Sequence, residues 1–188
     1  MTERIIIAGF GGQGVLFTGQ LLAYAGMTEG KHVSWIPSYG AEMRGGTANC
    51  SVTVADTEIS SPLVEEPDTL FAFNLPSLLK FAPRLKADGI LLLNSSLVKG
   101  GVKRKDVRLY PVAANEIAER IGSAQLANLV MLGAYLKLTG LVSFGSIAGA
   151  LEKILPPHRR HLLPANLQAL KEGERLFQHL ADSCSATQ

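Results

Sequence analysis

The sequence predicts an α/β fold: a mostly parallel β-sheet with flanking helices, an inserted β-hairpin and a helical C-terminal third. The first observation behind this prediction is the apolar run at residues 4–8, which ends at a glycine-dense turn and is typical of a strand buried on both faces. The second is that helix-like and strand-like stretches alternate through the first two thirds of the chain, as they do in βαβ units. The third is the series of helical patterns that begins at Leu126.

The chain has 188 residues, enough for one substantial core, and we expect a single domain over residues 1–188. Hydrophobic residues make up 47% and charged residues 18% of the sequence. This composition suits a compact domain and hints at a subunit whose apolar surface a partner covers in part. The net charge of +2 is small, and the concentrated basic runs are residues 103–105 and 158–161. A nucleic-acid ligand is therefore not predicted.

The cysteine content and the apolar segments indicate in which cellular compartment the protein is expected. The only cysteines are Cys50 and Cys184, so neither a disulfide framework nor a cysteine set for zinc or an iron–sulfur cluster is expected. The N-terminus enters a strand without the basic start and apolar core of a secretory signal. Residues 126–141, the longest apolar-rich segment, are too few to span a bilayer. We expect a cytoplasmic protein without a membrane segment.

The first half of the chain is expected to open with a β-α-β unit. After the first strand, residues 15–28 carry the apolar spacing of a helix that stops at Gly30, and residues 31–37 form the second strand. Residues 47–55 then alternate between polar and apolar side chains. We expect them to form an antiparallel hairpin with residues 58–60.

A further β-α-β unit is expected after this hairpin. Residues 70–74 and 89–94 read as strands, with a helix at residues 76–86 between them that Pro83 is expected to kink or shorten. The remaining elements are a strand at 108–112, a helix at 115–121, three helices at 126–138, 143–155 and 165–180, and a frayed tail at 181–188.

The glycine-dense turn, Gly-Phe-Gly-Gly-Gln-Gly-Val from Gly9, carries the first functional signal. Gly9, Gly11 and Gly14 satisfy G-x-G-x-x-G between a strand and a helix, as in Rossmann-like dinucleotide sites. The second strand offers no carboxylate before Glu42 to hold a ribose, so a conventional NAD or FAD site is disfavoured. Two interpretations stay open: a cradle for a phosphate or polar ligand, or a tight strand-to-helix crossing. The amide of Gln13 favours the first, although a capping or solvated glutamine gives the same signal.

The second signal is the loop Ser-Tyr-Gly-Ala-Glu-Met-Arg-Gly-Gly at residues 38–46, which follows the second strand. Arg44 is suited to hold an anionic group with its planar fork, and Tyr39 offers a hydroxyl. Glu42 is placed to orient Arg44 or to pair with another chain. Because binding residues gather in loops at strand ends, we interpret this segment as functional. The alternative is a surface ion pair on a structural turn.

Other candidate residues do not form a catalytic or metal-ligating set. The histidines share no ligand spacing, and no serine lies in a G-x-S-x-G elbow. We therefore predict neither catalytic residues nor a metal site on this chain.

At its two motifs the sequence resembles the gamma subunit of 2-oxoacid:acceptor (ferredoxin) oxidoreductases, the family of pyruvate, 2-oxoglutarate and ketoisovalerate oxidoreductases. The resemblance runs through residues 9–15 and 38–46, more loosely through residues 128–133, and covers nearly the whole chain. It implies a Rossmann-like domain that is one subunit of a larger enzyme. The two motifs together are specific, whereas the glycine turn alone is not.

The resemblance implies an enzyme that oxidatively decarboxylates a 2-oxoacid, forms an acyl-CoA and passes electrons to ferredoxin or a similar acceptor. It implies that thiamine diphosphate, Mg and the iron–sulfur clusters are bound by partner subunits, namely alpha and beta, with or without a delta, ferredoxin-like chain. This sequence has neither the thiamine motif nor a cysteine cluster, so no activity in isolation is expected. The resemblance also implies that coenzyme A is a substrate of the complex. Contacts between two copies of the chain are compatible with this resemblance.

The site residues implied by the resemblance lie in the two motifs. We expect them to line a site shared with other subunits, or a subunit interface, in contact with CoA or neighbouring chains. They are Gly11, Gly12, Gln13, Gly14, Tyr39, Glu42, Arg44, Gly45 and Gly46.

Two other functions stay open at this point. The glycine turn is compatible with a stand-alone nucleotide-binding Rossmann-like oxidoreductase, and both loops are compatible with a structural or regulatory interaction subunit. The sequence does not select among pyruvate, 2-oxoglutarate, branched-chain and aryl-pyruvate substrates.

Overall fold

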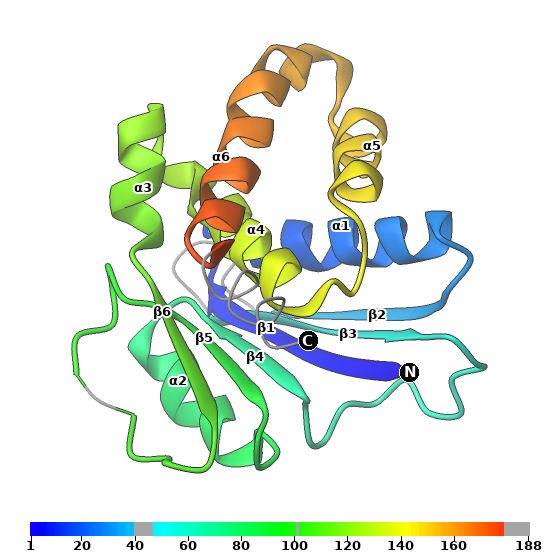
Figure 1. The fold of residues 1–188 in the computed structure, drawn as a ribbon, viewed down its shortest axis with the longest axis vertical. Helices are drawn as coiled ribbons and strands as arrows, with labels where there is room; N and C mark the ends of the chain where they lie inside the picture. Colours follow the sequence, from blue (N-terminus) through cyan, green and yellow to red (C-terminus); the bar gives the residue numbers. More distant parts are fainter. Residues whose placement is uncertain (40–46, 101, 179–188) are drawn as a thin grey trace, which may run out of the picture.

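The computed structural model describes residues 1–39, 47–100 and 102–178. Within these ranges a six-stranded sheet has the order β2-β3-β1-β4-β5-β6 and carries helices on both faces (Figure 1). The strands are β1 (Thr2–Phe10), β2 (His32–Tyr39), β3 (Thr47–Ala55), β4 (Thr69–Ala72), β5 (Ile90–Asn94) and β6 (Arg108–Val112). Neighbouring strands are parallel from β1 through β4 and β5 to β6, whereas β3 is antiparallel to both β1 and β2. The sheet is therefore mostly parallel, as predicted.

The helix α2 (Leu75–Phe81) lies on one face of the sheet, and the other α-helices lie on the opposite face (Figure 1). Those helices are α1 (Val15–Thr28), α3 (Ala114–Ile121), α4 (Ala127–Thr139), α5 (Phe144–Ile154) and α6 (Leu163–Arg175). Short 3₁₀ helices are η1 (Ala82–Arg84), η2 (Ala124–Leu126) and η3 (Pro157–Leu162). Across the described ranges, none of these helices has both the length and the apolar character that crossing a bilayer requires.

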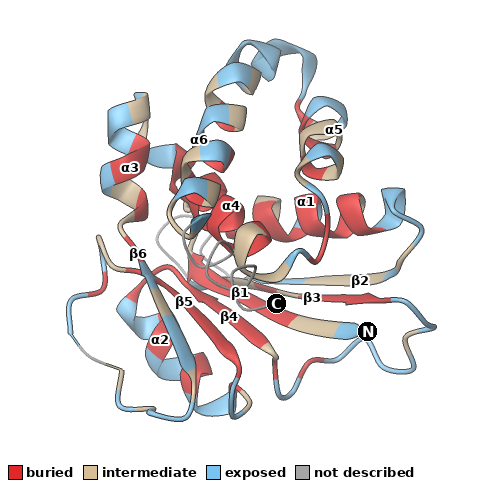
Figure 2. Cartoon of the chain, in the orientation of Figure 1, coloured by how far each residue is buried: buried red, intermediate tan, exposed pale blue. Residues whose placement is uncertain are grey.

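The central strand β1 contributes to the cores on both faces of the sheet. Ile5 and Ile7 join the large core beneath α1 and α4, while Ile6 and Ala8 join the smaller core beneath α2. All of them are at most 3% exposed, and Figure 2 shows β1 buried over most of its length. This burial on two sides explains the unbroken apolar run in the sequence.

The position of β3 corrects the predicted hairpin. Residues 58–60 are not a strand, and β3 pairs instead with β2 on one side and β1 on the other. The hairpin is therefore β2–β3. Its second strand, β3, lies between β1 and β2, which run in the same direction. The alternating sequence fits this place because Cys50, Val52 and Val54 face the large core. A strand inside the sheet also has partners for its backbone groups on both edges.

Two prolines lie near the ends of elements and have different effects. α2 ends at Phe81 and continues as η1, which contains Pro83, so the expected shortening of this helix is confirmed. β2 continues through Pro37 to Tyr39, beyond the end predicted from the sequence. Proline is tolerated there because β2 is an edge strand, which leaves one side of its backbone without a partner strand.

The last helix differs from the prediction at its C-terminal end. α6 ends at Arg175 and not at residue 180. Residues 179–188, which include the predicted frayed tail, lie outside the described residues.

The helices α4 and α6 cross in close backbone contact. A Cβ atom on Gly133 of α4 would collide with the carbonyl oxygen of Leu170, and one on Gly173 of α6 would collide with that of Val130. Only glycine fits at these two positions. The crossing fixes α4, whose first turn carries Asn128, over the carboxyl end of β1.

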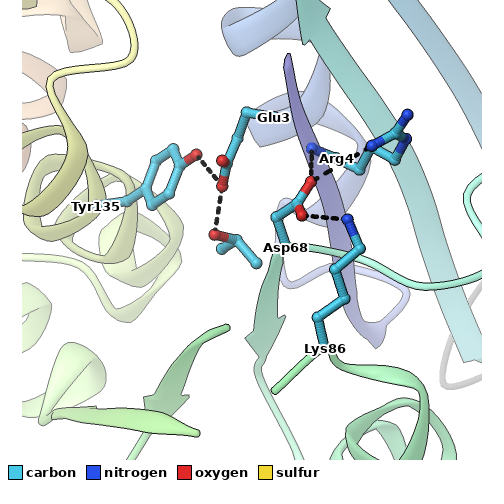
Figure 3. A network of polar contacts seen from close by, with 6 residues as sticks. Glu3, Arg4, Asp68, Lys86 and Tyr135 are labelled. Atoms are coloured by element: carbon cyan, nitrogen blue, oxygen red, sulfur yellow. Dashed lines mark hydrogen bonds and ion pairs between the residues drawn. The ribbon is translucent and has the colours of Figure 1, made fainter. Parts of the chain in front are cut away.

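A polar network lies at the other end of β1 (Figure 3). Glu3 Oε1 accepts hydrogen bonds from Thr69 Oγ1 at 2.7 Å and from Tyr135 Oη at 3.3 Å. Burial raises the pKa of the Glu3 carboxyl above its ordinary value. Beside it, Asp68 accepts from the backbone N–H of Arg4 at 2.8 Å. The network ties the start of β1 to β4 and to α4, and α4 also contacts the turn that follows β1.

Candidate functional site

The glycine turn joins the end of β1 to the start of α1 at the carboxyl edge of the parallel strands. It consists of Gly11, Gly12, Gln13 and Gly14. Gly12 has a φ of 96° and Gly14 a φ of 73°, values that residues with a side chain rarely adopt. Gly14 caps α1, which begins directly after it at Val15. The predicted strand–turn–helix arrangement is present, and it depends on these two left-handed glycines.

Gln13 closes the turn on itself. Its backbone N–H donates to the carbonyl oxygen of Phe10 at 3.2 Å, and the N–H of Phe10 donates back to Gln13 Oε1 at 2.7 Å. Asn74 Nδ2 donates to the same side-chain oxygen at 3.2 Å. The Gln13 oxygen is therefore used inside the fold. Of the two polar groups of this side-chain amide, the Nε2 group is therefore the one left to bind a ligand.

Asn74 is a site residue that sequence reasoning missed. It is 5% exposed, follows β4 and caps α2, because its Oδ1 accepts from the N–H of Ser77 at 2.9 Å. Through its Nδ2 group it also connects that helix to the glycine turn. The available signal was Asn-Leu-Pro-Ser after a strand, which is a helix start with proline in the first turn.

Asn128 holds the turn from the helical side. Its Nδ2 group donates to the carbonyl oxygen of Gly14 at 3.4 Å and to Thr18 Oγ1 at 3.3 Å, and the residue is 4% exposed. Thr18 Oγ1 in turn donates to the Gly14 carbonyl oxygen at 3.0 Å. A Cβ atom on Gly14 would lie 2.5 Å from Asn128 Nδ2. Side chains from α1 and α4 thus fix the last residue of the turn.

A hollow of about 380 Å³ lies over the first turn of α1. Its walls are mostly apolar, and no side chain among the described residues caps the backbone N–H groups of this helix end. The residues that line it are Phe10, Gly11, Gly12, Gly14, Val15, Leu16, Phe17 and Ala48. A helix N-terminus favours negative charge or a carbonyl oxygen. The hollow therefore suits a group that combines an apolar body with an oxygen acceptor.

The second predicted motif lies only partly within the described structure. In the backbone pairing Tyr39 lies opposite Ala48, and Phe10 lies opposite Thr47. The two ends of the loop therefore meet the edge of the sheet where the glycine turn lies, and Ala48 lines the hollow. Glu42, Arg44, Gly45 and Gly46 lie outside the described residues.

The sheet order argues against a conventional dinucleotide site. In that type of site, the strand beside β1 runs parallel to it and ends with a carboxylate for the ribose. Here the strand on that side of β1 is the antiparallel β3, and its residue beside Phe10 is Thr47. None of the described residues that line the hollow carries a carboxylate. The stand-alone nucleotide-binding oxidoreductase thus has no support from the geometry.

The described residues do not fit an iron–sulfur cluster or another bound metal. Within residues 1–39, 47–100 and 102–178, no three His, Cys, Asp or Glu side chains gather closely enough to hold a metal ion. Cys50 lies beneath α1, where its thiol is 3.6 Å from the carbonyl oxygen of Val15. Burial raises the pKa of this thiol to about 12, so it is a neutral packing group.

Comparison with known proteins connects this geometry to one family. The model of the family described as pyruvate ferredoxin/flavodoxin oxidoreductase matches residues 4–176. The chain is 34% identical to the 2-oxoglutarate synthase subunit KorC of Methanothermobacter marburgensis over 184 residues, which are 94% of this chain and 97% of KorC. It is 49% identical to the ketoisovalerate oxidoreductase subunit VorA of Methanothermobacter thermautotrophicus over 142 residues. Those residues are 73% of this chain and 29% of VorA, so the chain spans less than a third of that relative's length.

A solved structure has the same overall fold. It is the gamma subunit of the keto/oxoacid ferredoxin oxidoreductase from Geobacter sulfurreducens, with a TM-score of 0.79 and 28% identity. The similarity covers 92% of this chain and 96% of that one. It therefore extends over most of the fold and is not confined to one element.

Proposed function

Since this chain belongs to the pyruvate ferredoxin/flavodoxin oxidoreductase family, we propose that it is the gamma-type subunit of a 2-oxoacid:ferredoxin (acceptor) oxidoreductase. The observation that carries the proposal is the extent of the matches. The family model spans residues 4–176, and a relative of nearly the same length is itself called a subunit. A complex that reduces ferredoxin works in the cytoplasm, and we place the chain there.

We assign the reaction chemistry to the partner subunits, alpha and beta, with or without a delta, ferredoxin-like chain. In the complete enzyme, thiamine diphosphate with Mg would supply the chemistry for decarboxylating the 2-oxoacid, CoA would take the acyl group, and iron–sulfur clusters would carry the electrons to ferredoxin. The residues of this chain support the division of labour. Cys50, the cysteine that the structure describes, is buried and neutral, whereas a cluster needs several thiolates.

We propose that the two motifs form one wall of a site shared with those partners. Gly11, Gly12 and Gly14 line a hollow with apolar walls and a helix N-terminus, and Gln13 braces the same turn. This hollow suits a thioester or the amide-bearing arm of CoA better than an isolated phosphate. Tyr39, Glu42, Arg44, Gly45 and Gly46 belong to the loop that enters and leaves at the same edge. In this proposal Arg44 supplies the positive charge that the described part of the hollow lacks.

Reconstitution tests this function. We expect the purified chain alone to show no 2-oxoacid-dependent reduction of ferredoxin or a viologen dye. We expect activity when it is combined with the alpha and beta subunits of the same organism, and a loss of at least about tenfold when it is left out. Assays with pyruvate, 2-oxoglutarate and 2-ketoisovalerate in parallel identify the substrate. Full activity of the isolated chain would overturn the proposal, and so would an alpha–beta preparation that gains nothing from it.

A binding measurement tests the proposed wall separately. Arg44→Ala is expected to raise the KM for CoA in the reconstituted enzyme while leaving assembly unchanged. Arg120→Ala is the matched control because it removes the same kind of side chain from the last turn of α3, outside both motifs. If the two variants behave alike, the loop is an interface or structural element and does not contact CoA.

A further inference from the structure

The turn that joins α5 to α6 concentrates positive charge on one exposed segment. This segment is η3, Pro157–Leu162, which we call the basic turn, and it lies at the top of Figure 1. Every one of its residues is exposed. It carries His158, Arg159, Arg160 and His161, and the sequence contains no Asp or Glu between Glu152 and Glu172.

The two arginines of the basic turn have no ion-pair partner within the described residues. The salt bridges found there involve the N-terminus, Arg4, Lys31, Lys86, Arg104 and Arg175. In the other basic run, residues 103–105, the middle residue is paired, because Arg104 forms a salt bridge with Asp106 and donates to two backbone carbonyl oxygens. The basic turn therefore presents two neighbouring arginines that form no salt bridge among the described residues.

The backbone of the basic turn is held in place. Pro156 and Pro157 precede its cations, Pro164 follows them in the first turn of α6, and the N–H of Arg159 donates to the carbonyl oxygen of Pro156 at 2.8 Å. Proline fixes φ and so reduces the entropy lost when a partner binds. The backbone of the basic turn is thus preorganised for docking, unlike that of a flexible, solvated loop.

Apolar surface lies between the charges. Leu162 is 42% exposed, and a hollow of about 550 Å³ beside it is lined by Leu155, Leu163, Arg160, Lys153 and Glu152. The lining thus combines two leucines with charged side chains of both signs, and leucine beside arginine is a combination found in protein interfaces. Nucleic-acid binding by contrast needs cations spread along a groove or face, and the charge of the whole chain is only +2.

We propose that the basic turn docks onto a carboxylate-rich surface of the neighbouring subunit in the complex; this rests on the proposed function, which supplies that neighbour. The neighbour is identified by the longer relative. In VorA the part that matches this chain is 29% of the polypeptide and is covalently joined to the rest. KorC, 97% of which is covered by this chain, is itself called a subunit, and a subunit holds its partners by surface contacts. Opposite charges supply orientation and a faster encounter for such an association.

Charge reversal with a matched control tests the proposal. The probe is the subunit of the same organism that corresponds to the remainder of VorA, and its Kd for this chain is measured at low and at high NaCl. We expect Arg159→Glu with Arg160→Glu to weaken association at low salt by at least about tenfold and to remove most of its salt dependence. Lys103→Glu with Lys105→Glu changes the net charge equally at exposed positions of the other basic run and should shift Kd by less than about twofold.

The outcomes separate the two proposals. If the wild-type chain associates and the Arg159/Arg160 variant associates equally well, the docking proposal is wrong while the proposed function stands. If the wild-type chain does not associate with the probe at all, the proposed function fails as well. A short DNA duplex is titrated in parallel, and binding that depends on these arginines with unchanged subunit association would reassign the turn to nucleic acid. Arg159→Gln with Arg160→Gln repeats the test if the glutamate variant unfolds at a lower temperature than wild type.

Discussion

The side-chain amide of Asn128, on α4, donates to the carbonyl oxygen of Gly14 at 3.4 Å, across 114 residues of sequence. Gly14 is the residue at which β1 has ended and α1 is about to begin. One helix from the C-terminal half thus determines the geometry of a turn near the N-terminus. The candidate site is therefore a tertiary construction and not a local loop.

Removing the Asn128 side chain should destabilise the protein. Asn128→Ala takes away a buried donor and leaves Gly14 and Thr18 with one hydrogen bond fewer, so we expect the free energy of unfolding to fall by about 1–3 kcal/mol. Urea denaturation measures this change. Gln125→Ala removes a similar amide from an exposed position one turn earlier and should cost less than about 0.5 kcal/mol. Equal effects of the two substitutions would show that the Asn128 contact contributes nothing to stability.

Gly14 and Asn128 should also be energetically coupled. Gly14→Ala introduces a methyl group at a φ of 73° and only 2.5 Å from Asn128 Nδ2, whereas Gly12→Ala meets backbone strain without any neighbour within 4 Å. We expect Gly14→Ala to be the more destabilising of the two. In the double variant with Asn128→Ala the collision is relieved, so a double-mutant cycle should give a coupling of at least about 0.5 kcal/mol. Strict additivity would contradict the described packing.

Substitutions at Gln13 separate its structural role from ligand binding. Gln13→Leu leaves the N–H of Phe10 and the amide of Asn74 without their acceptor, and we expect a loss of about 1–3 kcal/mol in thermal or urea unfolding. Gln13→Glu keeps an acceptor oxygen in the same place and should retain most of that stability. If Gln13→Glu keeps stability and loses affinity for CoA in the reconstituted enzyme, the Nε2 group acts on the ligand. If it keeps both, Gln13 is purely a brace for the turn.

Local patterns were enough to predict where most of the elements lie, because their signals are carried by neighbouring residues. α1 spans residues 15–28 as predicted, since apolar spacing marks its length and Gly30 follows it with a φ of 76°. The pairing of β3 was not predictable in the same way. Alternation shows that a strand has a buried and a less buried side, but it does not show which strands lie beside it. The short turn after residue 55 suggested that β3 pairs with the residues that follow it. Instead, β3 lies beside β1, which precedes it in the sequence.

The residues of the candidate site likewise fall into those that local sequence predicts and those that act from distant parts of the chain. Gly11 to Gly14 lie at the predicted edge of the sheet because strand, turn and helix are consecutive in sequence. Asn74 was missed, and Asn128 entered only as the first of the loosely matching residues 128–133. Both act on the turn from 61 and 114 residues away, and asparagine is common in ordinary caps and turns. The parts played by Tyr39, Glu42, Arg44, Gly45 and Gly46 stay predictions, as does the single-domain organisation.

The buried carboxyl of Glu3 should give the protein a measurable pH dependence (Figure 3). Burial, which is the largest influence, and the nearby Asp68 raise its pKa, while hydrogen bonds from Thr69 and Tyr135 and the charge of Lys86 oppose the rise. A raised pKa means that the folded protein binds this proton more tightly than the unfolded chain does. The stability gained from it is therefore present at low pH and is lost as the pH rises from the ordinary glutamate value of about 4.3 through the folded-state value.

Glu3→Gln removes this titration while keeping an oxygen that accepts from Thr69 and Tyr135. We expect the difference in unfolding free energy, variant minus wild type, to increase between about pH 4 and pH 8, because only the wild type must hold a buried charge at the upper end. Groups with a lowered pKa, such as Asp56, which the N-terminal ammonium and Lys31 hold at about 2, act equally in both proteins and cancel in the difference. Glu66→Gln, at an exposed position, is the matched control, and urea denaturation at each pH gives the values. A difference for Glu3→Gln that stays constant over this range would mean that Glu3 has the same pKa in the folded and the unfolded protein, contrary to the effect of its burial.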